Sequence, residues 1–176
     1  MNKDELRQAV REAKRKVPFE QKVLRSAAIM ERLESMPAFV NAKVVLLYWS
    51  MRDEVYTHDL VNRWYTRKTI LLPCVDGDNL ILRQYTGPKC LKAGEQFGIG
   101  EPTGAEYTDI DKIDLIVVPG VAFDSHRNRM GRGRGFYDRL LCNTNATKIG
   151  VAFNFQYFPS IPVDSHDIPM DDVVVE

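Results

Sequence analysis

The sequence has little of what marks several common classes of protein. Its 3 cysteines among 176 residues are widely spaced and form no C-x-x-C pair, which argues against a disulfide scaffold and a structural zinc site. Its longest apolar runs, such as VVLLYW, are far too short to cross a bilayer. The charged first residues lack the apolar core of a secretory signal. The 24 Lys and Arg balance the 24 Asp and Glu, so no overall field favours nucleic acid or an anionic membrane. We therefore expect a cytoplasmic protein with no nucleic-acid and no membrane partner.

The chain also lacks repeats, low-complexity segments and a Pro/Gly/Ser-rich linker, so we expect one domain over residues 1–176. Two hydrophobic periods alternate along it. The helical period covers 3–17, 21–36, 57–67 and 136–143, and strand-like runs cover 43–50, 69–75, 80–85, 113–120 and 148–153, with a short edge strand expected near residue 175. This alternation predicts an α/β fold, a single doubly wound, mainly parallel sheet with helices on both faces and an N-terminal helical segment. The Gly- and Pro-rich stretch 86–104 is predicted to be a long functional loop.

Ligands of such sheets bind at the carboxyl ends of the strands. Three segments with polar residues follow predicted strands here: SMRDE at 50–54, PGVAFD at 119–124 and FNFQ at 153–156. Topology alone therefore indicates a site where these segments converge.

The stretch MGRGRGFYDR, residues 130–139, places three glycines and two arginines directly before a predicted helix. Glycine lets backbone N–H groups approach an anion closely, while a helix N-terminus and arginine side chains add positive charge. A phosphate-binding loop, an ordinary surface turn and an RNA-binding Arg-Gly segment are the three interpretations. The spacing matches neither G-x-G-x-x-G nor G-x-x-x-x-G-K-[ST], so no dinucleotide fingerprint or Walker loop is indicated. The position between a buried strand and a helix disfavours the RNA interpretation.

Five motifs in order along the chain resemble those of the 5-formyltetrahydrofolate cyclo-ligase family. They are the K-x-x-L-R residues Lys3, Leu6 and Arg7, then SMRDEVYT with Glu54, FGIGEP, VVPGVAFDSHRNRMGRGRGFYDR, and His166-Asp167. The sequence departs from the family pattern at Arg127, where Gly is usual, at Met130 in place of Leu, and at Phe136 in place of the first Tyr.

The resemblance implies that the protein converts 5-formyltetrahydrofolate to 5,10-methenyltetrahydrofolate, with ATP as co-substrate, Mg²⁺ as cofactor and release of ADP and phosphate. A monomer is expected. The implied catalytic residues are Arg134, Tyr137 and Glu54. The implied ATP-binding residues are Lys3, Arg7, Arg129, Gly131, Arg132, Gly133, Arg134, Gly135, Phe136 and Tyr137. Folate would contact Trp49, Glu54, Arg132, Arg134 and Tyr137, and Mg²⁺ would bind Asp138 and Asp167.

Without the resemblance, each of these residues also has an ordinary structural explanation. Lys3 and Arg7 would be solvated helix charges, Trp49 a core residue, and Asp138 an acid that complements a helix dipole. Two other functions remain open from the residues alone. One is a sugar-phosphate isomerase or CoA-transferase-like enzyme that uses Glu54 as a base, and the other is a non-catalytic RNA-binding module.

Overall fold

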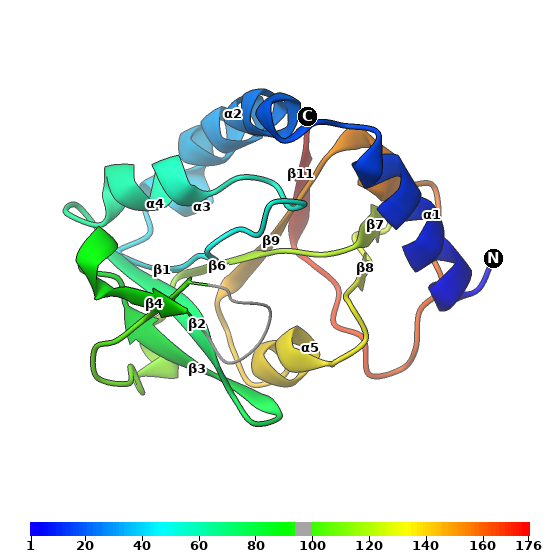
Figure 1. Cartoon of the computed structure of the whole chain (residues 1–176). Coiled ribbons are helices and arrows are strands. Elements are labelled where there is room, and N and C mark those ends of the chain that lie inside the picture. Colours follow the sequence, from blue (N-terminus) through cyan, green and yellow to red (C-terminus); the bar gives the residue numbers. More distant parts are fainter. Residues whose placement is uncertain (94–99) are drawn as a thin grey trace.

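The computed structural model describes residues 1–93 and 100–176, and its centre is a six-stranded sheet (Figure 1). The strand order is β11-β9-β6-β1-β2-β3, and every neighbouring pair is parallel except β2 and β3, which form an antiparallel hairpin. The strands are β1 (Val44–Leu46), β2 (Thr69–Asp76), β3 (Asn79–Gln84), β6 (Leu115–Val118), β9 (Thr147–Ala152) and β11 (Asp172–Val175). From β1 the chain adds β2 and β3 on one side and then crosses to β6 on the other, so the strand order reverses between β1 and β6. Such a reversal opens a crevice at the carboxyl ends of the strands.

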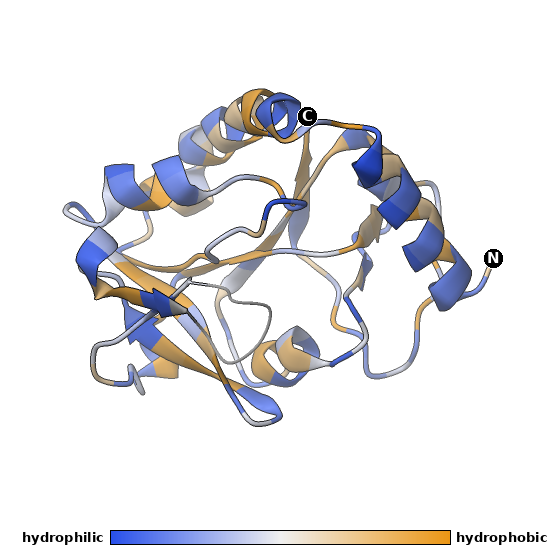
Figure 2. Cartoon of the chain, in the orientation of Figure 1, coloured by the Kyte–Doolittle hydropathy of each residue, from blue (hydrophilic) through white to orange (hydrophobic). Residues whose placement is uncertain are grey.

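Helices cover both faces of this sheet, as predicted. On one face lie α2 (Phe19–Ser35), α3 (Pro37–Val40) and α4 (His58–Trp64), which share a buried core with alternate residues of the strands. The opposite face is covered by α5 (Phe136–Leu141), through Leu141. Figure 2 shows hydrophobic strands at the centre of the sheet and hydrophilic outer surfaces on α1 and α2. The sheet is buried on both sides, which explains why its strands are continuous apolar runs.

Helix α1 (Lys3–Arg15) lies apart from the other helices, beside a second, smaller sheet (Figure 1). Asn2 and Glu5 form a capping box at its start. Leu6 and Val10 pack against Ala122 and Met130 of the small sheet. This sheet has the order β10-β7-β8, with β7 at Ala122–Asp124, β8 at Arg129–Met130 and β10 at Tyr157–Phe158. The sequence did not reveal these strands, because two or three residues are too few for a hydrophobic period to emerge.

Two predicted segments differ in the structure. The strand expected over 43–50 ends at Leu46. Beyond it, the carbonyl of Tyr48 accepts a hydrogen bond from the Thr57 hydroxyl, and Ser50 and Thr57 exchange hydrogen bonds between backbone and side chain. These bonds pull the chain out of the sheet.

The stretch 86–104, expected to be a loop, contains a short 3-10 helix at Pro88–Cys90 and the antiparallel strands β4 (Leu91–Ala93) and β5 (Gly100–Pro102). The FGIGEP motif falls partly outside the described residues. Two further short 3-10 helices are Ile110–Lys112 and Asn154–Gln156.

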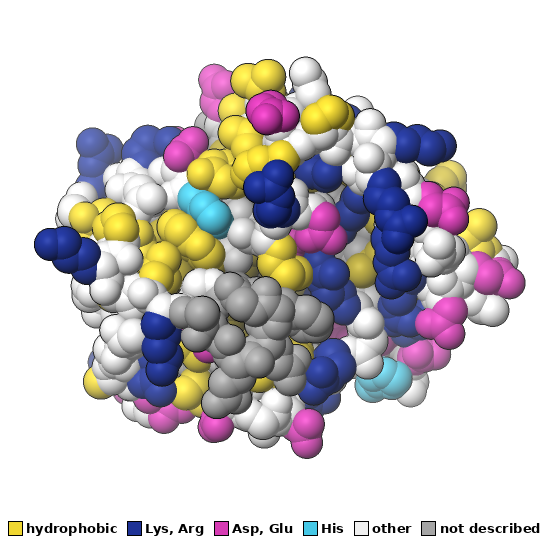
Figure 3. Space-filling model, viewed as in Figure 1, with side chains coloured by type: hydrophobic (Ala, Val, Ile, Leu, Met, Phe, Trp, Pro, Cys, Tyr) yellow, Lys and Arg dark blue, Asp and Glu magenta, His cyan; other side chains and the backbone are white. Residues whose placement is uncertain are grey.

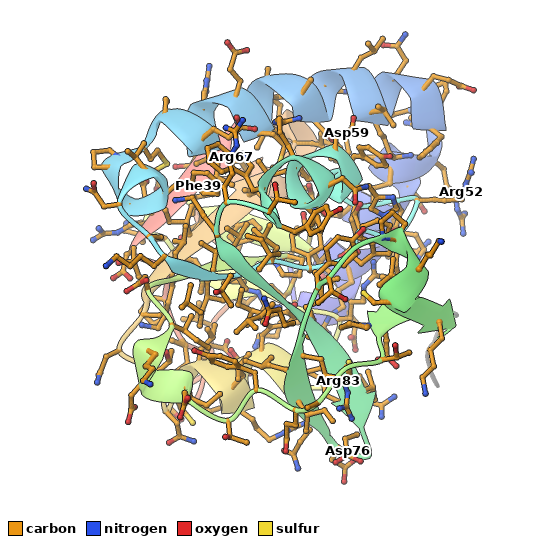
Figure 4. All side chains as sticks on the ribbon, turned by 90° about the vertical axis from the view of Figure 1, so that its left-hand side faces the viewer. Phe39, Arg52, Asp59, Arg67, Asp76 and Arg83 are labelled. Carbon is orange, nitrogen blue, oxygen red and sulfur yellow. The ribbon has the colours of Figure 1, made fainter. Side chains whose placement is uncertain are left out.

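Figure 4 shows α2 across one edge of the molecule and the β2–β3 hairpin reaching away from it, with Asp76 and Arg83 on the hairpin. The expected edge strand near the carboxyl end is confirmed as β11, which pairs in parallel with β9. Among the described helices, none combines the length and the hydropathy needed to cross a membrane.

Gly150 on β9 is required by close packing against Phe123 of the small sheet. A Cβ at position 150 would lie 2.9 Å from Cδ1 of Phe123 and closer still to Cε1. Both residues are buried, so the ring has no open space into which to move. We expect Gly150→Ala to lower the free energy of unfolding by about 1–3 kcal/mol, measured by urea denaturation. Gly104→Ala is the control, because a Cβ at Gly104 meets no atom within 4 Å. Equal stabilities of the two variants would contradict this packing.

Candidate active site

A pocket of about 350 Å³ opens at the carboxyl ends of β1 and β6, at the reversal of strand order. The segments that follow these two strands form its floor, with Tyr48, Trp49 and Glu54 after β1 and Pro119 and Gly120 after β6. The predicted convergence of SMRDE and PGVAFD is confirmed. The third segment, FNFQ, lines no part of this pocket; the Gln156 side chain donates to the carbonyls of Gly120 and Val121 and so supports the floor.

The pocket brings together every predicted site residue. From α1 come Lys3 and Arg7, from the β8–α5 segment come residues 129 and 131–138, and from the carboxyl-terminal loop comes Asp167. In Figure 3, Lys and Arg side chains gather in the right half of the view, where α1 lies. The cations of the pocket therefore come together from two distant segments, and carboxylates line the same pocket, namely Glu54, Glu101, Asp138, Asp164 and Asp167.

The glycine–arginine loop, defined here as residues 131–135, depends on glycine at two positions. Gly133 has φ +105° and Gly135, the residue before α5, has φ +71°, values that other residues adopt only with strain. The Nε of Arg7 donates a hydrogen bond of 3.0 Å to the carbonyl of Gly131, which fixes the start of the loop to α1. Because α5 is only six residues long, the loop backbone and the arginines carry more of any anion-binding capacity than the helix dipole does.

Arg129 is the buried member of the arginine group. Its Nε donates to the carbonyl of Pro119 over 2.7 Å, and its guanidinium lies 5.2 Å from the centre of the Tyr137 ring. The Nη1 atom of Arg129 also lies 3.9 Å from a carboxylate oxygen of Asp138. Arg129 therefore holds the pocket wall together and does not project into solvent.

The turn between β7 and β8 tolerates Arg127 where the family usually has glycine. Arg127 has φ +66°, in the left-handed region. The buried Asp124 carboxylate accepts hydrogen bonds from the backbone N–H groups of His126, Asn128 and Ile161. These bonds hold the turn closed although Arg127 stands in a conformation that favours glycine.

Lys3 lies between two carboxylates. Its ammonium is 2.7 Å from Asp164 and 2.8 Å from Asp167, so the first residue of α1 is joined to the carboxyl-terminal loop. Although burial opposes it, the hydrogen bond from Lys3 contributes to a pKa of Asp167 below its usual value. Asp138 lines the same pocket and accepts a long hydrogen bond of 3.4 Å from the N–H of Ile168.

Glu54 is a carboxylate in a desolvated part of the pocket. Burial raises its pKa, and Asp53 adds to the rise, against the opposing effects of the Met51 N–H, Arg132 and Lys14. Burial also raises the pKa of Tyr137, and the nearby Glu54 contributes. Perturbed acids and phenols of this kind in a cleft are typical of catalytic sites.

The pocket has an aromatic wall at Trp49. The Trp49 ring stacks on His58 with centroids 3.7 Å apart and lies 5.8 Å from the Tyr85 ring. A ring nitrogen of His58 bonds the Ser50 carbonyl at 2.9 Å, which holds the His58 ring in place beside Trp49. Trp49 packs against the core, as its ordinary structural explanation requires, and it also lines the pocket.

Sequence reasoning missed the charged pair Lys14 and Asp53 beside the pocket, 3.5 Å apart. Lys14 lies four residues after Val10 on the buried stripe of α1, and that helical spacing was the available signal.

A model of the 5-formyltetrahydrofolate cyclo-ligase family matches residues 1–176. The chain belongs to this family. It is 32% identical over 144 residues to the 5-formyltetrahydrofolate cyclo-ligase of Haemophilus influenzae, and this match covers 77% of this chain and 76% of that protein. It is 28% identical over 187 residues to that of Mus musculus, covering 97% and 92%. The resemblance inferred from five motifs is therefore confirmed, and the protein is an enzyme of a ligase family.

Solved structures of the same family agree with the fold. The NMR structure of Aquifex aeolicus 5,10-methenyltetrahydrofolate synthetase superposes with a TM-score of 0.89 at 38% identity, over 99% of this chain and 90% of that one. The 5,10-methenyltetrahydrofolate synthetase of Mycoplasma pneumoniae superposes with a TM-score of 0.80 at 22% identity and shares the fold.

The neighbouring rings Phe136 and Tyr137 have different surroundings, which gives a test of their roles. Phe136 lies beside the guanidinium groups of Arg134 and Arg139, whereas Tyr137 lies over the buried Arg129 near Glu54. We expect Tyr137→Phe to lower the ligase turnover rate by about tenfold and Phe136→Tyr to leave it within about twofold. Steady-state kinetics of the two variants provide the measurement. Equal, small effects would reduce Tyr137 to a packing residue.

Proposed function

We propose that the protein catalyses the ATP-dependent cyclisation of 5-formyltetrahydrofolate to 5,10-methenyltetrahydrofolate, with release of ADP and phosphate. Family membership supports the reaction type. One structural observation carries the proposal to this chain: a single pocket is lined by the cationic loop with Lys3 and Arg7 and also by Trp49 and Glu54. A pocket with both kinds of lining suits a polyphosphate and an aromatic, partly polar ring system.

The chemistry explains why a nucleoside triphosphate is required. The N5-formyl group is an amide, whose oxygen is a poor leaving group. Transfer of the γ-phosphoryl group of ATP to that oxygen releases ADP and yields an imino-phosphate at N5. N10 of the same folate then attacks the formyl carbon, the N10 proton leaves, and loss of phosphate completes the methenyl bridge. Both steps depend on alignment and on neutralisation of phosphate charge, more than on covalent participation of the protein.

The residues around the pocket suit these tasks. The glycine–arginine loop, together with Lys3 and Arg7, would bind the triphosphate, because its backbone and side chains supply donors from two segments that Arg7 already joins. Arg134 and Tyr137 would contact the transferred phosphoryl group and the formyl oxygen. Trp49 would stack on the pterin or aminobenzoyl ring.

Glu54 would receive the proton that N10 loses. Its raised pKa makes it a stronger base than an exposed carboxylate. The N–H of Met51 donates 2.9 Å to one of its oxygens and fixes the carboxyl group in orientation.

The carboxylates at the pocket fit a magnesium ion. Asp164, His166 and Asp167 hold their ligand atoms within 4.8 Å of one another, and Lys3 demonstrates that two of them attract a cation. Asp138 is not a member of this group among the described residues, but it lines the same pocket. Hard oxygen ligands are those that Mg²⁺ prefers, so Asp138 and Asp167 would hold it. The ion would supply positive charge to the phosphates.

The function is tested by mixing the protein with 5-formyltetrahydrofolate, Mg²⁺ and ATP and recording the absorbance of the methenyl product. We expect product only when ATP is present, with one ADP formed per methenyl group. Absence of product from folded protein would refute the proposed reaction, and product without ATP would refute the phosphorylated intermediate.

Replacement of Glu54 tests whether this residue serves the folate or the nucleotide. We expect Glu54→Gln to lower turnover by at least about tenfold, a typical loss for a removed general base, while calorimetry shows unchanged ATP affinity. In the wild type, activity should fall on the acid side as the carboxylate gains a proton, and this fall should begin at a higher pH than for an exposed glutamate because burial raises the pKa. The acid limb should be absent from the residual activity of Glu54→Gln. A loss of ATP affinity would instead place Glu54 in the nucleotide half.

Magnesium dependence tests Asp138 and Asp167. We expect Asp138→Asn and Asp167→Asn each to raise the Mg²⁺ concentration needed for half-maximal activity, by about tenfold. The double variant should show less than the sum of the two changes, because both remove ligands of one ion. Asp111→Asn, an exposed replacement of the same kind, is the control. An unchanged Mg²⁺ requirement in Asp167→Asn would remove that residue from the metal site.

A further inference from the structure

Lys14, Asp53 and Arg132 form a connected row of charged side chains beside the pocket. The proposed reaction gives a role to Arg132 and none to Lys14 or Asp53. Lys14 of α1 places its ammonium 3.5 Å from a carboxylate oxygen of Asp53. Both oxygens of Asp53 accept from the same guanidinium nitrogen of Arg132, at 3.2 Å each. The three residues come from α1, from the segment after β1, and from the glycine–arginine loop.

Lys14 is unusual because its side chain is only 8% exposed. A buried ammonium is costly unless a partner offsets the loss of water, and burial accordingly lowers the pKa of Lys14. Asp53 supplies the opposing charge. Although burial acts against it, Lys14 and Arg132 hold the pKa of Asp53 below its usual value. The carboxylate is therefore anionic at neutral pH and is held from two sides.

Helix α1 is connected to the glycine–arginine loop at Gly131 directly and at Arg132 through Asp53. Arg7 bonds the carbonyl of Gly131, and Lys14, seven residues or two turns further along the same face, reaches Asp53 and through it the side chain of Arg132. One rigid element thus fixes both the backbone before Arg132 and the direction of its guanidinium. Leu6 and Val10, which lie on the same side of α1, bind the helix to the small sheet.

The same charges surround Glu54. Lys14 comes from α1, Asp53 from the same loop, and Arg132 from the glycine–arginine loop. Among the described residues, Tyr48 after β1, Arg129 of β8 and Tyr137 of α5 also lie near Glu54. Asp53 raises the pKa of Glu54, whereas Lys14 and Arg132 lower it. Removal of the Lys14 charge should therefore raise the pKa of Glu54.

We propose that Asp53 is a positioning residue that directs Arg132 into the pocket, and that Lys14 anchors Asp53, so that the pair sets both the anion affinity of the glycine–arginine loop and the charge balance at Glu54. This inference rests on the proposed function in one respect, because it takes the pocket to be an anion site.

The first experiment measures binding of inorganic tripolyphosphate by calorimetry, which requires no turnover. Asp53→Asn removes a negative charge near the anion, so a purely electrostatic effect would tighten binding. Positioning demands the opposite, and we expect binding to weaken about three- to tenfold because Arg132 loses its direction. Tighter or unchanged binding would overturn the proposal. Asp111→Asn, an exposed position away from this pocket, is the matched control.

A second variant guards against a general loss of structure. Asp53→Glu keeps the charge but moves the carboxylate by one methylene, so positioning predicts weakened binding and a charge effect predicts wild-type affinity. The unfolding temperature of each variant is measured first.

The role of Lys14 is tested by Lys14→Met, which removes the charge at similar length and should weaken tripolyphosphate binding. Lys16→Met is its exposed control two residues away. Lys14→Arg should recover most of the affinity that Lys14→Met loses.

The second experiment follows the Glu54 carboxyl carbon by NMR during a pH titration, with Glu54→Gln to assign the signal. We expect Lys14→Met to raise the midpoint, because it removes a cation that lowers the pKa of Glu54, and the exposed control Lys16→Met to leave it unchanged. An unchanged or lowered midpoint in Lys14→Met would overturn the second half of the proposal.

Kinetics distinguish this inference from the proposed function. In the methenyl assay, Asp53→Asn should raise KM for ATP with kcat largely retained, whereas Glu54→Gln should mainly lower kcat. If the wild type binds tripolyphosphate but forms no methenyl product, the proposed reaction fails and the positioning role is still decided by calorimetry. If the wild type turns over and Asp53→Asn binds normally, the reaction stands and the positioning role fails.

Discussion

The apolar contact between α1 and the small β10-β7-β8 sheet is the constraint on which the pocket depends. Leu6 and Val10 are buried in this contact, and they lie on the side of the helix that also carries Lys14. Because side chains three, four and seven residues apart share a helix face, burial of the apolar stripe fixes where the neighbouring cations lie. Lys3 and Arg7 consequently reach the pocket although they are more than 100 residues away in sequence from the glycine–arginine loop.

The large sheet supplies the other half of the arrangement. Its strand order reverses between β1 and β6, so the chain leaves both strands at the same edge and in opposite directions. Thr57 then draws the segment after β1 away from the sheet through its bonds to Tyr48 and Ser50, and this displacement leaves room for the pocket. A longer β1, as the apolar run alone would suggest, would place Trp49 and Ser50 within the sheet.

Much of this arrangement could be predicted from the sequence, for different reasons at different places. Periodicity identified the large sheet and its covering helices because buried parallel strands are continuous apolar runs. Family motifs identified Lys3, Arg7, Glu54 and the glycine–arginine loop, which local chemistry alone left open. The strands β7 and β8 were missed because they are too short to carry a period. The pair of Lys14 and Asp53 was missed because their contact joins residues 39 positions apart, and no local pattern records which charges meet across such a distance.

The two carboxylates that share Lys3 have a consequence for how ligands enter. An ammonium held at 2.7 and 2.8 Å by Asp164 and Asp167 cannot at the same time give its full charge to a phosphate. A phosphate that draws Lys3 away leaves two carboxylates in need of a cation, and a cation that takes their oxygens releases Lys3 toward a phosphate. Under the proposed assignment of this pocket, anion binding and cation binding would therefore be reciprocally linked, each increasing the affinity for the other by the same factor. Occupation of this corner of the pocket would then be an exchange of ionic partners at a single lysine.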